Sequence, residues 1–305
     1  MREPLYVDVS SLNHVRVLGR GAYGSVSLEE HPRYGFYAKK KSSMHHRENL
    51  EKELRIMLRF RNHPRIVQAA DDCLHLGTES QGCFIYMEYA FEGTLHNIIS
   101  RFRGESMPEY VIQRASRMIL QGLQMLHSRG YVHCDLKPSN VLVFPSTTQG
   151  EPWDLKISDF GSCKEPNTDH APFCGGTPKY MSPESFWYGP KGQIHPAFDI
   201  WSLGCVVYEM FGGKAKQEYL EEYYEWKLFK DISPAANDFL KLCHGWHPSN
   251  RDTAERLNQP VRATAAELLN HPFVTQRLDV PHCRCQPQDK IGQNFQIFSG
   301  GRCLI

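Results

Sequence analysis

Short stretches in which apolar residues cluster, or alternate with polar ones, recur along the chain, and most of them lie before residue 90. Where the period is two, as in residues 25–28, one face of a strand is buried and the other faces solvent. Seven stretches predict strands: residues 15–18, 25–28, 36–41, 66–67, 84–90, 141–144 and 155–158. The last two are expected to form a hairpin across a polar turn.

A helical spacing of apolar residues begins near residue 46 and continues to residue 60. The apolar stripe of this predicted helix consists of Leu50, Leu54, Met57 and Leu58. Glu53 borders the stripe, and a carboxylate at the edge of a buried face needs a partner, for which Lys40 is the candidate. Glu48 and Glu51 are the alternative partners, and a plain surface position for Glu53 is the other interpretation.

Helical periods predominate after residue 90, which favours an α+β fold with the strands early and the helices late. Residues 92–95 predict the start of one helix. Residues 106–109 have the spacing of a capping box and predict the start of a long helix, with Gly130 in its C-cap region. Residues 199–210 are mostly apolar and predict a buried helix.

The composition is that of an ordinary globular protein, with 305 residues, 41% hydrophobic and 23% charged. A net charge of +1 argues against binding to nucleic acid or to an anionic membrane by bulk attraction. The ten cysteines lack the spacing of a disulfide scaffold, and no secretory signal or bilayer-spanning run is found. We therefore expect reduced thiols and a cytoplasmic location, with the nucleus as a second compartment.

Candidate chemistry lies around residues 133–140, which read HCDLKPSN, and residues 159–161, which read DFG. The predicted hairpin would place Asn140 and Asp159 at the same end of neighbouring strands. Their oxygens suit Mg²⁺, which prefers a few hard protein ligands together with phosphates. Asp135 would then be a separate carboxylate, free to orient a hydroxyl nucleophile.

Gly19, Gly21 and Gly24 form a GxGxxG pattern, which by itself is a weak signal of a dinucleotide fold. That fold expects a helix after the glycines, whereas residues 25–28 alternate like a strand. A strand, a glycine turn and a second strand make a hairpin that can lie over phosphates, because side chains would hold the backbone away from the ligand. An ordinary hairpin is the alternative.

The pattern HxDLKxxN followed by DFG resembles the catalytic core of eukaryotic protein kinases. The joint pattern, in this order, is highly specific. The resemblance implies a bilobal fold, with a β-rich N-lobe at residues 12–89 and an α-helical C-lobe at residues 90–274, and with ATP between the lobes. Residues 1–11 would then be a lead-in, and residues 275–305 would be a tail outside the kinase domain.

The same resemblance implies roles for the charged residues. Asp135 would orient the substrate hydroxyl, and Lys137 would approach the migrating phosphoryl group. In the family's V-A-I-K pattern the lysine stands two positions after the alanine, which selects Lys40 over Lys39 and Lys41 as the lysine on the α- and β-phosphates. Its partner would be Glu53, whose spacing to the following apolar residues matches the family best. The two Mg²⁺ ligands would be Asn140 and Asp159.

The nucleotide site implied by the resemblance draws on several segments. Met87 would be the gatekeeper, and Glu88 and Ala90 would present backbone groups to adenine. The remaining contacts would come from the glycine-rich loop, at Gly19, Gly21 and Gly24, and from the side chains that stack on adenine, Val26, Ala38 and Leu142. Plain core packing is the alternative for each of these side chains, and both can hold together.

Residues 159–184 would be the activation segment, and its end resembles the substrate-docking stretch of the family, with serine in place of one alanine. Glu184 should form a buried ion pair with an arginine, for which Arg262 fits best and Arg251 is the competing choice. Asp199, at the start of the buried helix, would hold the backbone of the catalytic loop, residues 133–140.

The implied reaction is transfer of the γ-phosphoryl group of ATP to a protein serine or threonine hydroxyl. Several segments look most like plant-type MAP kinase kinase kinases, whose substrates are MAP kinase kinases. We expect a monomer that acts on a protein substrate. A pseudokinase scaffold and a small-molecule phosphotransferase are the alternatives; the first would lack a key lysine or aspartate, and the second would lack the docking segment.

Cys134 departs from the family, which has an arginine before the catalytic aspartate. That arginine normally pairs with a phosphorylated residue of the activation segment. Lys164 is the remaining candidate for a positive charge there. We hypothesise that activity depends less on phosphorylation of this segment, and restoration of activity by a phosphate on Thr168 or Thr177 would contradict this.

Overall fold

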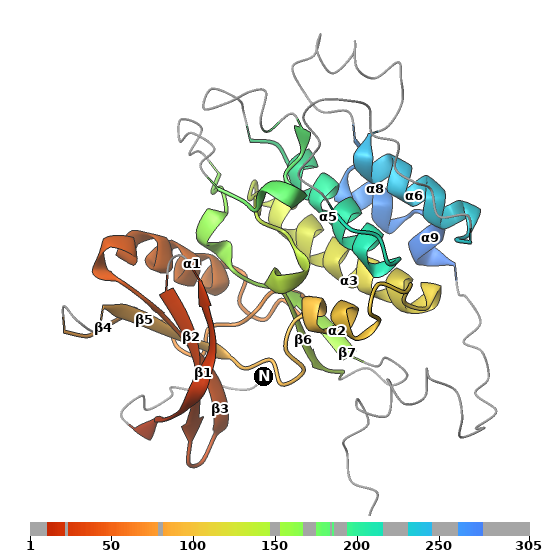
Figure 1. Ribbon diagram of the computed structural model, residues 1–305. Helices are drawn as coiled ribbons and strands as arrows, with labels where there is room; N and C mark the ends of the chain where they lie inside the picture. Colours follow the sequence, from red (N-terminus) through yellow and green to blue (C-terminus); the bar gives the residue numbers. More distant parts are fainter. Residues whose placement is uncertain are drawn as a thin grey trace, which may run out of the picture.

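The chain folds into a small lobe of strands with one helix and a larger lobe of helices with one hairpin (Figure 1). The predicted α+β class and the order of strands before helices are therefore confirmed. This computed structural model describes residues 11–21, 24–78, 82–146, 153–166, 175–183, 185, 194–215, 231–245 and 262–276. Within these residues, no helix is both long enough and apolar enough to pass through a lipid bilayer.

The small lobe is built on an antiparallel five-stranded sheet in the order β1-β2-β3-β5-β4. Its strands are β1 (Asn13–Gly21), β2 (Gly24–His31), β3 (Gly35–Ser42), β4 (His75–Leu76) and β5 (Cys83–Glu88). The sequence did not predict β4, because two residues are too short to show a period. The strand predicted at residues 66–67 is wrong, since Ile66 makes a single bridge to Ile157 of the large lobe instead of joining this sheet.

Helix α1 (Arg47–Arg59) packs against β5 on one side of this sheet (Figure 1). Its predicted apolar stripe is largely confirmed, because Leu50, Leu54 and Met57 are buried. Leu58 is only half-buried, and the fully buried Ile56 takes its place. The stripe is thus rotated slightly from the predicted one, and this rotation brings Glu53 into the buried face.

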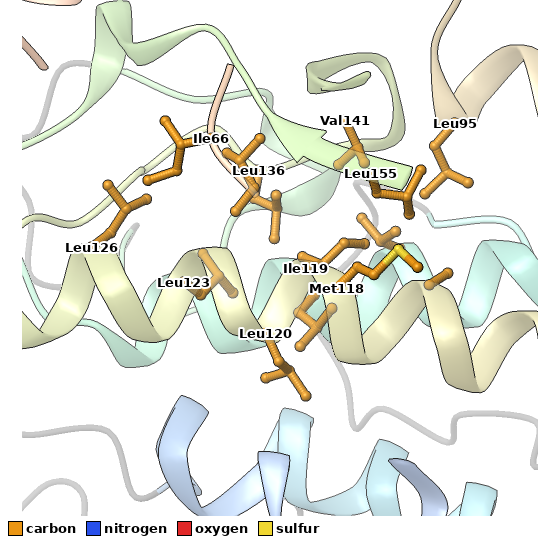
Figure 2. Packing of buried hydrophobic residues seen from close by; sticks show 14 of the residues in the cluster. Ile66, Leu95, Met118, Ile119, Leu120, Leu123, Leu126, Leu136, Val141 and Leu155 are labelled. Atoms are coloured by element: carbon orange, nitrogen blue, oxygen red, sulfur yellow. The ribbon is translucent and has the colours of Figure 1, made fainter. Parts of the chain in front are cut away.

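The large lobe is organised around α3 (Glu109–Ser128), which lies between the hairpin of residues 141–145 and 153–157 and the helices that follow residue 196 (Figure 1). Figure 2 shows Ile119, Leu123 and Leu136 gathered between α3 and the hairpin. Gly122 lets α3 approach the hairpin closely, because a Cβ there would lie 2.7 Å from Ile157 Cδ1. The other elements are α2 (Leu95–Arg101), β6 (Val141–Pro145), β7 (Trp153–Ile157), α5 (Ala197–Met210), α6 (Pro234–His244), α8 (Ala265–Leu269) and α9 (Pro272–Thr275).

The capping box predicted at residues 106–109 is wrong, although α3 begins where it was expected. The hydroxyl of Ser106 donates to the carbonyl of Met107, and Pro108 occupies the N-cap position. The carboxylate of Glu109 instead accepts hydrogen bonds from the backbone and the hydroxyl of Ser233, at the start of α6. A tertiary contact between two helix starts has therefore replaced the local cap.

Candidate active site

Lys40 of β3 lies between two carboxylates that come from different parts of the chain. Its Nζ is 2.6 Å from Oε2 of Glu53 on α1 and 2.9 Å from Oδ1 of Asp159, which follows β7. Burial alone would lower the pKa of Lys40, but the charges of Glu53 and Asp159 raise it, so the ammonium group stays charged. Of the glutamates considered as its partner, only Glu53 is buried, whereas Glu51 is exposed and lies 4.0 Å from Arg47.

Asp159 adopts a left-handed backbone conformation, with φ 66° and ψ 74°, before the short 3₁₀ turn Phe160–Ser162. Burial raises the pKa of its carboxyl, but the charge and hydrogen bond of Lys40, together with the nearby charge of Lys137, hold it below its usual range. The fully buried ring of Phe160 packs edge-on against His133, with ring centroids 5.5 Å apart. The carboxylate therefore remains ionised on a backbone that its buried neighbour fixes in place.

Asp199 of α5 holds the backbone of the loop that carries the catalytic candidates. It is fully buried, and its carboxylate accepts hydrogen bonds from the amides of His133 (2.8 Å) and Cys134 (2.9 Å). The ring of His127 on α3 adds a third hydrogen bond at 2.8 Å. These bonds compensate for the burial of a charge and allow Cys134 to keep a positive φ of 65°. The structure has Asp199 in the position predicted from the sequence.

Asp135 sits at the centre of a hydrogen-bonded group on this loop. Its Oδ2 accepts from Lys137 Nζ (2.8 Å) and from Asn140 Nδ2 (3.1 Å). Its Oδ1 accepts from the hydroxyl of Thr177 (2.8 Å), which in turn accepts from Lys137 Nζ (2.7 Å). The sequence analysis named Thr177 as a phosphorylation site but did not predict its contact with Asp135 and Lys137.

The two halves of the candidate site meet at the start of the hairpin. Val141 of β6 pairs with Ile157 of β7, so Asn140 and Asp159 lie at the same end of the two strands, as expected. The carbonyl of Asn140 accepts hydrogen bonds from the backbone (2.9 Å) and the hydroxyl (3.0 Å) of Ser158. The structure thus brings the group around Asp135 next to the group around Lys40.

The candidate nucleotide contacts line the sheet and the segment that joins the lobes. Ala38 pairs with Met87 across β3 and β5, and both are buried, as is Ala90. Val26 pairs with Lys40, and Leu142 forms a bridge to Thr94 next to α2. The half-buried Val26 and Leu142 pack against the same core as Ala38 and Met87, so core packing accounts for all four side chains without excluding contact with a ligand.

The three glycines of the first hairpin have different physical roles. Gly24 opens β2, and a Cβ there would lie 1.8 Å from the carbonyl oxygen of Lys41, so no other residue fits. A Cβ at Gly19 or Gly21 would meet nothing within 4 Å. Packing within the described chain therefore requires glycine at Gly24 but does not explain the other two.

Glu88 contributes a side-chain contact that the sequence did not reveal. Its carboxylate lies 2.6 and 2.7 Å from Nζ of Lys156 on β7 and accepts from the backbone of Gln68 at 2.8 Å. Family resemblance had indicated only the backbone groups of Glu88. An ion pair thus joins the last residue of β5 to the hairpin of the large lobe.

The predicted ion pair of Glu184 cannot be placed, because Glu184 and Arg251 lie outside the described residues. Arg262 is described, and its guanidinium stacks over the ring of Trp201 at 4.9 Å.

Comparison with known proteins decides the family. The family described as "Protein kinase domain" matches residues 12–274. The chain belongs to the protein kinase family. The predicted bilobal kinase fold is accordingly confirmed.

Relatives of this kinase are named as serine/threonine kinases and as MAP kinase kinase kinases. The kinase is 32% identical to mitogen-activated protein kinase kinase kinase 5 of Arabidopsis thaliana over 83% of this chain and 37% of the relative. It is 29% identical to mitogen-activated protein kinase kinase kinase 1 of the same plant, over 90% of this chain and 45% of the relative. It is 30% identical to serine/threonine-protein kinase 17A of Oryctolagus cuniculus, over 90% of this chain and 69% of the relative. The kinase thus spans less than half the length of the first two relatives.

Proposed function

We propose that this kinase transfers the γ-phosphoryl group of ATP to serine or threonine hydroxyls of a protein. The observation that carries the proposal is the group formed by Asp135, Lys137 and Thr177, with contacts of 2.7–2.8 Å, beside the Lys40–Glu53 ion pair. Phosphoryl transfer asks mainly for positioning and charge neutralisation, and these residues supply both. The kinase domain proposed for this reaction is residues 12–274, with the lobes divided near residue 90.

The catalytic loop supplies the groups that would act on the substrate. Asp135 Oδ1 accepts a threonine hydroxyl in the structure, so the same carboxylate can accept the hydroxyl of a protein substrate. Lys137, bonded to Asp135 Oδ2, would place its charge beside the phosphoryl group as it moves. Together they orient the nucleophile and neutralise the charge that develops on the transferred group.

The donor atoms of Asn140 and Asp159 fit Mg²⁺. The amide nitrogen of Asn140 donates to Asp135, which leaves its amide oxygen as the atom suited to a cation. Asp159 keeps an ionised carboxylate, and a carboxylate with an amide oxygen forms the hard oxygen set that Mg²⁺ prefers. Bound Mg²⁺ would neutralise phosphate charge.

The small lobe would bind the nucleotide. Lys40, held by Glu53, would contact the α- and β-phosphates, and Gly19 and Gly21 would let the backbone approach them. The adenine would stack between Val26, Ala38 and Leu142, with Met87 as gatekeeper and with backbone contacts from Glu88 and Ala90. Within the described residues, packing gives no reason for glycine at Gly19 and Gly21, which supports this arrangement.

For the substrate we propose a MAP kinase kinase, so that this protein acts as a MAP kinase kinase kinase. Support comes from the plant relatives that carry this name at about 30% identity. The rabbit relative carries a different kinase name at similar identity, so the test must compare substrates. We further propose a monomer that acts in the cytoplasm and the nucleus.

The test is a phosphotransfer assay with Mg²⁺-ATP and a panel of MAP kinase kinases that carry inactivating substitutions of their own. Myelin basic protein serves as a general substrate. The wild type should phosphorylate at least one member of the panel, and Lys40→Met and Asp135→Asn should each lose activity by orders of magnitude while they stay folded. Transfer to myelin basic protein alone would disprove the MAP kinase kinase kinase role. Undiminished transfer by Asp135→Asn, or none by the wild type, would overturn the kinase proposal and favour a scaffold.

A further inference from the structure

One turn of α1 contacts the residues that follow the 3₁₀ turn Phe160–Ser162 at two charged points. Lys52 Nζ donates to the carbonyl of Cys163 at 3.1 Å. Arg55 makes a two-pronged contact with Glu165, from Nε to Oε1 at 3.2 Å and from Nη2 to Oε2 at 2.7 Å. The start of the activation segment is therefore bound directly to the helix that carries Glu53.

The catalytic loop contacts the same segment without a charged side chain at Cys134. The Cys134 thiol is buried and lies 3.4 Å from the carbonyl of Val132, and burial raises its pKa well above the usual range, so it is neutral. Val132 and Lys164 pair through their backbones, at 3.1 and 2.8 Å. The loop thus fixes the position of the segment, but Cys134 offers no cation that could bind a phosphate.

The spacing of the α1 residues connects these contacts to the nucleotide site. Lys52 and Arg55 are three positions apart and therefore share one face of the helix. Glu53 lies beside them on the buried side, where it holds Lys40 at 2.6 Å. If α1 were to shift away from residues 163–165, Glu53 would move with it, and the contact with Lys40 would lengthen.

We propose that the Glu165 carboxylate, through its ion pair with Arg55, holds α1 in place. A phosphate on the activation segment would otherwise be needed to supply this negative charge. Arg55 and Lys52 are then positioning residues that keep Glu53 against Lys40 in the unphosphorylated kinase. The inference rests on the proposed phosphotransfer function and deepens it, because it names how the same site is regulated. The contact between Glu165 and Arg55 does not require phosphorylation of any residue.

The expected loss of activity depends on how exposed the Arg55–Glu165 pair is to water. The Glu165 side chain is 18% exposed and that of Arg55 is 56% exposed, so water screens the pair. A two-pronged arginine–carboxylate pair is nevertheless among the stronger surface contacts. We expect its loss to change activity by roughly two- to five-fold, well below the loss caused by Lys40→Met.

The experiment compares phosphatase-treated full-length variants. Glu165→Gln and Arg55→Gln each remove the pair, and the double variant Arg55→Glu with Glu165→Arg reverses it. Arg47→Gln is the matched control, because it removes an exposed arginine and its ion pair with Glu51 on the same helix, while the Glu51 charge near Arg55 stays in place. The readouts are kcat with myelin basic protein and hydrogen exchange of the amides of residues 50–57.

The dephosphorylated wild type should be active, with slow exchange in α1. The two single variants should lose roughly two- to five-fold in kcat and exchange faster, the reversed pair should recover, and Arg47→Gln should match the wild type. A wild type that gains ten-fold or more on phosphorylation, or a Glu165→Gln variant that exchanges like Arg47→Gln, would overturn the inference. If the wild type transfers no phosphate in either state, the proposed function fails, and the exchange comparison still decides whether the pair holds α1.

Discussion

The hydroxyl of Thr177 donates a hydrogen bond to Oδ1 of Asp135 at 2.8 Å, although the two residues are 42 positions apart. Lys137 completes the triangle, since its Nζ lies 2.8 Å from Asp135 Oδ2 and 2.7 Å from the same hydroxyl. The end of the activation segment is thereby joined to the catalytic candidates. The half-buried hydroxyl fixes the orientation of both charged groups before any substrate arrives.

Thr177→Val should reduce kcat by about ten- to one hundred-fold, because it keeps the shape of the side chain and removes the hydrogen bonds that orient Asp135 and Lys137. Thr177→Ser keeps the hydroxyl and should retain most of the activity. A phosphate on Thr177 would place two negative charges against Asp135 and should inactivate the kinase. Steady-state kinetics of the three forms, with melting temperatures to establish folding, check this; full kcat in Thr177→Val would contradict it.

The sequence predicted the parts of the site that depend on rigid local spacing. Lys40 was selected by the family's V-A-I-K pattern, and the period of two in β3 places it on the same face as Ala38. Asn140 and Asp159 could be placed together because they flank paired strands. Asp199 stands at the start of an almost wholly apolar helix, and its role came from the resemblance of this helix to the family's buried helix. In each case the residue's position in a regular element determines where its side chain lies.

The sequence failed where a residue's partner comes from a distant element. The contact of Thr177 with Asp135 follows only from where residues 175–183 pack. The carboxylate of Glu109 reaches α6 instead of capping its own helix, because Ser233 is presented to it by tertiary packing. Residues 66–67 have a strand-like composition, yet they lie against β7 because the loop after α1 docks on the large lobe.

Asp199→Ala should lower the free energy of unfolding by about 3–5 kcal/mol, because it leaves His127 and two backbone amides of the catalytic loop without their acceptor. Burial raises the pKa of Asp199, but its hydrogen bonds, with the one from His127 the strongest, hold it below the usual range. The carboxylate therefore contributes stability above about pH 4, and this is lost as the pH falls through the lowered pKa. Urea unfolding at pH 7 measures the loss. A free energy of unfolding within about 1 kcal/mol of the wild type would show that the Asp199 carboxylate is not needed to stabilise the loop.

Lys156→Met should weaken ATP binding more than it slows turnover. The Glu88 carboxylate accepts two contacts from Lys156 and one from Gln68, so it ties the end of β5 to β7 beside the proposed adenine contacts. Methionine keeps the packing of the Lys156 stem, whose ammonium lies 4.7 Å from the centre of the Phe144 ring, but removes the charge. Because the Glu88 side chain is 28% exposed, the stability loss should be only about 1 kcal/mol.

Kinetics at varied ATP concentration check this, with an expected rise in KM for ATP of about three- to ten-fold and a smaller change in kcat. The variant with Glu88→Lys and Lys156→Glu together should recover part of the affinity. If Lys156→Met leaves KM for ATP unchanged, the ion pair has no role in shaping the nucleotide site.

Helices α5 and α6 meet at Gly204 and His244, where there is no room for another atom. A Cβ on Gly204 would lie 2.4 Å from Nε2 of His244 and 2.9 Å from Cβ of Cys243. The ring of His244 packs edge-on against Trp201, with centroids 4.8 Å apart. Burial and the nearby charge of Arg262 lower the pKa of His244 to about 3.

This lowered pKa predicts a loss of stability in mild acid. His244 is neutral in the folded kinase and binds a proton in the unfolded chain below about pH 6.5, so its contribution is complete above that pH and is lost as the pH falls towards 3. The slope from this one group approaches about 1.4 kcal/mol per pH unit. His244→Gln removes the titration, and whatever its stability at pH 7, its free energy of unfolding should fall less steeply between pH 6.5 and 4.5 than that of the wild type. Urea unfolding at four pH values measures both slopes, and equal slopes would mean that His244 is protonated in the folded kinase as readily as in the unfolded chain.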